Sequence, residues 1–82
     1  MPVSVGQNFL RKGSLPQTVM SYAVSEPGEW TAEDIASDIS VTVYVVTETI
    51  GSLRRRKMLL ILEKQIHPTE IGIKALSRSM SR

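Results

Sequence analysis

The sequence contains no cysteine, and His67 is its only histidine. Disulfide bonds and thiolate zinc sites are therefore excluded, and a lone histidine leaves few zinc arrangements and no histidine-paired nucleophile. Beside Pro68, His67 is expected to have a structural role in a turn. The five glycines form no phosphate-binding loop. We expect no enzyme, no metal, no cofactor and no small-molecule substrate.

Aromatic residues are also few: one tryptophan, two tyrosines and one phenylalanine, scattered along the chain. This argues against binding of single-stranded nucleic acid by base stacking. No apolar run approaches the roughly 18–20 residues that cross a membrane. The first six residues lack the basic and apolar stretches of a secretory signal. We therefore expect a cytoplasmic protein of 82 residues with one domain and no membrane partner.

Negative charge is scarce in the second half of the chain. The net charge is only +2, but six of the eight acids precede Ser52 and eight of the ten bases follow it. This asymmetry predicts a basic side that attracts a polyanion. Asp34 and Asp38 share a helix face without a second acidic pair or a histidine, so we expect them to form a solvated surface.

The first half of the chain predicts an arm and two helices. Residues 1–13 form the arm, packed on the domain through Phe9 and Leu10. A capping box of Ser14 and Gln17 begins the first helix, and the turn at residues 26–28 ends it. Trp30 is expected to be a short strand and a core anchor. Thr31 caps the second helix, which ends near Ser40.

Residues 41–53 fit two structures. The alternating valines Val41, Val43 and Val45 favour a strand. The spacing i, i+4, i+7 of Val46, Ile50 and Leu53 favours a helix, capped by Thr42 and ended by the basic run 54–57. We predict the helix, because the short second helix needs a crossing partner.

The second half predicts a hairpin and a closing helix. Residues 58–62 form an apolar strand, 63–65 a turn, and 66–67 a return strand. A last helix begins at Thr69-Glu70, and its buried stripe is expected to be Ile73, Leu76 and Met80, joined by Ile71 and Ala75. A polar, frayed tail is expected to follow at residues 79–82.

Residues 30–59 combine several features of one known family. An isoleucine–alanine pair, two apolar residues around a turn and a buried helical stripe are followed by a basic exit: Ile35, Ala36, Ile39, Val41, Val46, Ile50, Leu53 and residues 54–59. The sequence therefore resembles the winged helix-turn-helix family of bacterial transcription regulators, over about residues 15–78. Ser40 and Lys57 stand where this family often has glycine, in left-handed backbone.

The resemblance implies an α+β fold: a three-helix core with a small antiparallel β-wing and a C-terminal helix, in a domain at residues 14–78. It also implies binding of double-stranded DNA, with a recognition helix at about residues 42–55 in the major groove. The implied contacts are Thr42, Val43, Tyr44, Thr47, Arg54 and Arg55, with Lys64 at the wing tip. Small accessory regulators of operons, phages and plasmids have this build.

Two points leave another interpretation open. Glu48, on the same helix face, would repel phosphates, and residues 54–57 are also the cations that a helix C-terminus favours. A winged-helix protein–protein adaptor without DNA contact is therefore the alternative. A homodimer, held by the closing helix or by the arm around Phe9 and Leu10, is expected for reading two half-sites, with a partner regulator as the alternative.

Overall fold

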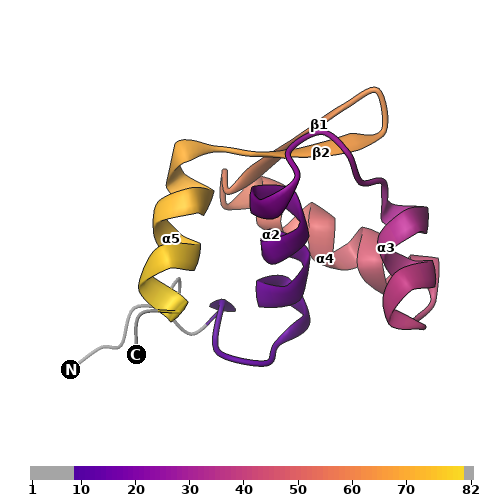
Figure 1. Ribbon diagram of the computed structural model, residues 1–82, viewed down its shortest axis with the longest axis horizontal. Helices are drawn as coiled ribbons and strands as arrows, with labels where there is room; N and C mark the ends of the chain where they lie inside the picture. The colour runs from indigo at the N-terminus through magenta and orange to yellow at the C-terminus, as the bar shows by residue number, and fades with distance from the viewer. Residues whose placement is uncertain (1–8, 81–82) are drawn as a thin grey trace.

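The computed structural model describes residues 9–80 (Figure 1). The elements follow in the order α2 (Leu15–Ser25), α3 (Ala32–Ile39), α4 (Val43–Arg55), β1 (Leu59–Leu62), β2 (Gln65–Pro68) and α5 (Glu70–Met80). This part of the chain is an α+β fold of four helices and one two-stranded antiparallel sheet. Helices α3 and α5 lie at opposite ends of the long axis, with α2 and α4 between them.

Each helix begins after a hydroxyl residue whose side chain accepts a hydrogen bond from a backbone N–H three residues later. The donors are the amides of Gln17 (3.3 Å), Asp34 (3.1 Å), Val45 (3.4 Å) and Gly72 (3.1 Å), and the acceptors are Ser14, Thr31, Thr42 and Thr69. Such caps satisfy amides that have no partner within the helix. The predicted starts of all four helices are confirmed. The side chain of Gln17, however, accepts from Gly13 N–H at 2.9 Å rather than from Ser14.

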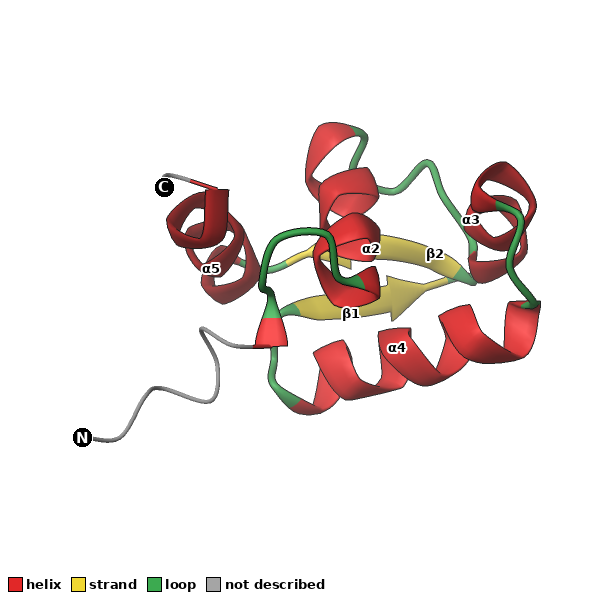
Figure 2. Cartoon of the chain, turned by 90° about the horizontal axis from the view of Figure 1, so that it is seen from below, coloured by secondary structure: helices red, strands yellow, loops and turns green. Residues whose placement is uncertain are grey.

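The ambiguous segment is a helix, and the strand alternative is wrong. Val46, Ile50 and Leu53 are buried on one stripe of α4, as predicted. Helix α3 lies against the N-terminal half of α4 (Figure 2), where the small side chain of Ala36, 3% exposed, permits a close approach. Ser40 ends α3 in the left-handed conformation, with φ 61°, and Lys57 follows α4 with φ 62°.

The hairpin is tighter than expected. Glu63 and Lys64 both have positive φ, 53° and 72°, so two residues suffice to reverse the chain. Leu62 then pairs with Gln65, which belongs to β2 and not to the turn. The short strand expected at Trp30 is reduced to an isolated bridge between Thr31 and Gln65, supported by a hydrogen bond from Ile66 N–H to Trp30 C=O at 2.9 Å.

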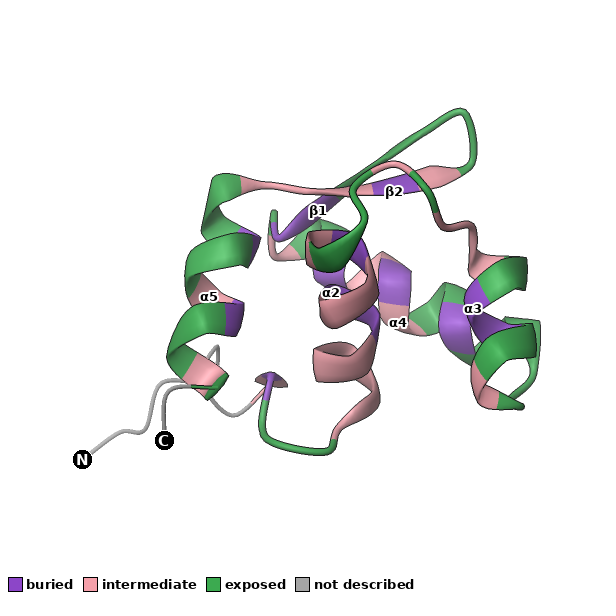
Figure 3. Cartoon of the chain, in the orientation of Figure 1, coloured by how far each residue is buried: buried purple, intermediate pink, exposed green. Residues whose placement is uncertain are grey.

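The core lies between α2, α4 and the inner face of the hairpin (Figure 3). Its buried members are Leu10, Val19, Met20, Ala23, Ile35, Ala36, Val46, Ile50, Leu53, Met58, Leu59, Ile66 and Leu76. Leu10 has no exposed surface and Phe9 packs against the cluster, which confirms the predicted contact of the arm with the domain. The rest of the arm, residues 1–8, and the end of the tail, residues 81–82, lie outside the described residues.

The predicted buried stripe of the closing helix is wrong except at Leu76, with Ala75 half-buried. Ile71, Ile73 and Met80 are 53%, 44% and 63% exposed, whereas Gly72 and Leu76 are buried. The helix turns its smallest residue inward because it crosses the backbone at Met58 too closely for a side chain. It also runs through Met80, so the first two residues of the expected tail are helical.

Candidate nucleic-acid interface

The N-terminal half of α4 is an exposed surface. Val43 is 41% exposed and Tyr44 is 70% exposed, and Thr42, Thr47 and Glu48 are exposed as well. Thr42 accepts the capping bond from Val45 N–H at 3.4 Å, and its hydroxyl proton remains available for donation. All four residues predicted as DNA contacts in this half therefore present their side chains to solvent.

Apart from Val45, the exposed residues of α4 lie on two of its sides. Tyr44, Glu48 and Arg55 lie opposite the buried stripe. Val43, Thr47 and Arg54 lie together on one flank, separated by four and seven residues. Each side therefore carries one of the predicted basic contacts: Arg55 lies on the same side as Tyr44, and Arg54 lies on the same side as Val43 and Thr47.

The basic run 54–57 is not a single feature. The guanidinium of Arg56 stacks on the ring of Phe9, with its carbon 3.8 Å from the ring centroid, so this cation is engaged in packing of the arm. Arg54, Arg55 and Lys57 are exposed. Arg54 and Arg55, the members of the run predicted to contact phosphates, are therefore both accessible, as is Lys57.

Gly51 is a residue of this surface that the sequence analysis missed. A Cβ built at Gly51 would lie 3.7 Å from Nη1 of Arg55, and Nη2 of Arg55 donates to the Ser52 hydroxyl at 3.2 Å. The guanidinium therefore lies back along α4, toward its N-terminal half. The spacing of four residues between Gly51 and Arg55 was the available clue, because side chains on a helix point toward its N-terminus.

Glu48 is the one acid on the outer side of α4. Among the described residues it forms no ion pair. Its carboxylate therefore opposes phosphate contact by its neighbours, unless it accepts a hydrogen bond from a cytosine amino group. Apolar exposure is high around it, since Val41, Val43 and Val45 are 38%, 41% and 41% exposed.

Lys64 is not brought together with these residues. It lies at the hairpin tip, and the bridge between Thr31 and Gln65 places that tip beside the start of α3. Thr42 follows the opposite end of α3, so the length of this helix separates the tip from the start of α4 (Figure 1).

The described residues define an α+β protein whose order of helices and hairpin is consistent with a winged-helix layout. None of its helices within residues 9–80 combines the length and apolar character needed to cross a membrane. No family model matches the sequence, and no curated protein or solved structure matches the chain. The resemblance to the winged helix-turn-helix regulators therefore stays a prediction.

Proposed function

We propose that this domain is a winged helix-turn-helix regulator that binds double-stranded DNA in a sequence-specific manner. The observation that carries the proposal is the presentation of α4. Its first turn is capped by Thr42 and held by α3, while Val43, Tyr44 and Thr47 stay exposed. A helix that is supported in this way can insert its N-terminal turns into a major groove.

The chemistry of these side chains suits contacts with both the bases and the phosphate backbone of DNA. Thr47 can hydrogen-bond a base edge, Val43 can contact a thymine methyl group, and Tyr44 can reach a phosphate. Arg54 and Arg55 supply the positive charge that draws the phosphate backbone. A single domain offers few such contacts, so we propose binding as a homodimer to two half-sites.

The alternative is a protein–protein adaptor with the same fold. It is favoured by a specific observation: the N-terminal half of α4 exposes Val43, Tyr44, Val45 and Glu48 but no base. Such a surface also suits a protein partner.

The two functions are distinguished by the salt dependence of duplex binding. We would titrate the protein into a labelled random duplex at two salt concentrations. A DNA binder loses affinity steeply with salt, and Arg55→Gln should lower the log–log slope by about 0.9 if Arg55 neutralises one phosphate. Lys74→Gln, which removes the same charge from α5 instead of α4, is the control. Absence of binding at low salt, or equal slopes for both variants, would support the adaptor.

A further inference from the structure

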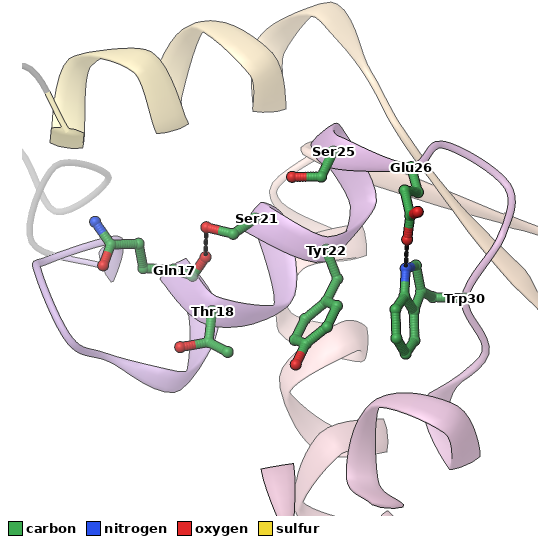
Figure 4. A pocket seen from close by; sticks show the side chains of 7 residues that line it. All are labelled: Gln17, Thr18, Ser21, Tyr22, Ser25, Glu26 and Trp30. Carbon is green, nitrogen blue, oxygen red and sulfur yellow. Dashed lines mark hydrogen bonds between the residues drawn. The ribbon is translucent and has the colours of Figure 1, made fainter. Parts of the chain in front are cut away.

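A hollow opens on the outer side of α2 and extends to Trp30 (Figure 4). Its lining consists of hydroxyl, amide, aromatic and carboxylate side chains: Gln17, Thr18, Ser21, Tyr22, Ser25, Glu26 and Trp30. No lining residue belongs to α4 or to the hairpin. The lining of the hollow therefore does not overlap the proposed DNA contacts.

Two aromatic rings form one end of this hollow. Tyr22 and Trp30 meet edge to face, with their centroids 4.5 Å apart and their planes at 62°. Trp30 is the only tryptophan of the chain. It is half-buried, so part of its ring packs against the core and part remains accessible.

The polar tips of both rings donate to carboxylates. Trp30 Nε1–H donates to Glu26 Oε1 at 2.7 Å, and the Tyr22 hydroxyl donates to Asp38 Oδ2. Asp38, expected only as part of a solvated surface, is thus tied to α2. These hydrogen bonds fix both rings and occupy their donors, so a ligand would contact the accessible parts of the electron-rich ring faces.

The electrostatics of the hollow favour a positive ligand. Neither Glu26 nor Asp38 forms an ion pair within residues 9–80, and no base lines the hollow. Donation to a carboxylate also increases the electron density of each ring. Aromatic faces beside carboxylates attract organic cations, whose weak hydration makes them easier to desolvate than metal ions.

We propose that this hollow binds an organic cation, an alkylammonium or guanidinium group, against Tyr22 and Trp30 with Glu26 as its counter-charge. The hydroxyls of Thr18, Ser21 and Ser25 lie along the same hollow and can accept N–H donors. The cation is either a free small molecule or a basic side chain of a second copy of this chain, whose bases are concentrated after Ser52.

Trp30 itself reports on binding, because its fluorescence is the only tryptophan emission of the protein. Tetramethylammonium chloride is titrated into the full chain, with sodium chloride at equal ionic strength as the reference. We expect a saturable change in Trp30 emission with the organic cation only. Glu26→Gln, which keeps an acceptor for Trp30 Nε1–H but removes the charge, should weaken binding about five- to tenfold. Glu63→Gln at the hairpin tip is the charge-matched control and should bind as the parent does.

A non-saturable response, or equal affinities of Glu26→Gln and the parent, overturns the proposal. Thermal unfolding of each variant shows whether a lost response reflects misfolding; in that case Tyr22→Phe, which keeps the ring but frees Asp38, must instead change the affinity. Dilution of the protein in the absence of tetramethylammonium distinguishes the two sources of the cation, a free small molecule and a second copy of the chain. Emission that depends on protein concentration and is reset by tetramethylammonium indicates a second copy, and emission that does not depend on it indicates a free ligand. Neither result depends on DNA binding.

Discussion

A Cβ at Gly72 would lie 2.0 Å from the carbonyl oxygen of Met58 and 2.7 Å from Cε of Met20. Helix α5 therefore approaches the entrance of the hairpin only because residue 72 has no side chain. Thr69 holds the same junction, since its hydroxyl donates to Lys57 C=O at 2.6 Å and its N–H donates to Met58 C=O at 3.0 Å. The closing helix is thus tied to the strand entrance by backbone contact rather than by an apolar stripe.

Gly72→Ala should destabilise the domain, because the Met58 backbone cannot move aside as a flexible side chain would. We expect a loss of about 1–3 kcal/mol in the free energy of unfolding, measured with urea. Gly51→Ala is the matched control: its Cβ meets only Arg55 Nη1 at 3.7 Å, and alanine in a helix is favoured by up to about 1 kcal/mol. Equal effects of the two substitutions would show that α5 does not dock as described.

Ser40→Gly should stabilise the domain. Ser40 has φ 61° at the end of α3, a conformation that costs a non-glycine residue about 1 kcal/mol. Ser37→Gly, one turn earlier in the regular part of the same helix, should instead cost about 0.5–1 kcal/mol. Opposite signs of the two shifts in the urea midpoint are expected. A destabilising Ser40→Gly would mean that the serine side chain contributes more than its backbone conformation costs.

The Tyr22–Asp38 contact makes stability depend on alkaline pH. The hydrogen bond to Asp38, assisted by burial and by the charge of Asp38, raises the pKa of Tyr22 above its ordinary value of 10.0. A phenol whose pKa is raised by folding contributes stability that is complete below pH 10 and is lost as pH rises through the folded pKa. The melting temperature should therefore fall more steeply above pH 10 in the parent than in Tyr22→Phe.

The control for this titration is Tyr44→Phe. Tyr44 is 70% exposed and its hydroxyl makes no hydrogen bond to another described residue. This variant should retain the alkaline decline of the parent. If the melting temperature of Tyr22→Phe fell above pH 10 as steeply as that of the parent, the hydrogen bond between Tyr22 and Asp38 would not account for the decline.

Glu48→Gln tests the proposed DNA interface from the opposite direction to the arginine variant. Removal of a carboxylate from the outer side of α4 should strengthen binding to random duplex about two- to fivefold at low salt. Glu33→Gln, an equal charge change in the exposed first turn of α3, should have less effect. If the protein is an adaptor, neither substitution confers duplex binding, and fluorescence anisotropy would show this directly.

The local sequence was sufficient to predict the starts of the four described helices and the buried face of α4. A hydroxyl cap and an i, i+4, i+7 stripe act within a few residues, so Thr42, Val46 and Leu53 carry that information without reference to the rest of the chain. The left-handed backbone at Ser40 and Lys57 was anticipated in the same way, from the position of each at the end of a helix.

The tertiary structure alone decided which face of α5 is buried, which arginine of the basic run is engaged, and where Tyr22, Trp30 and Asp38 meet. Hydropathy predicted that Ile73 and Met80 face inward, but steric exclusion at the Met58 backbone selected Gly72. Arg56 stacks on Phe9, which is 47 residues earlier in the chain, whereas Arg55 contacts only its own helix through Ser52. Tyr22 and Asp38 are 16 residues apart and share no periodic pattern. Contacts of this kind depend on how separate elements pack against one another, and local sequence patterns do not determine that packing.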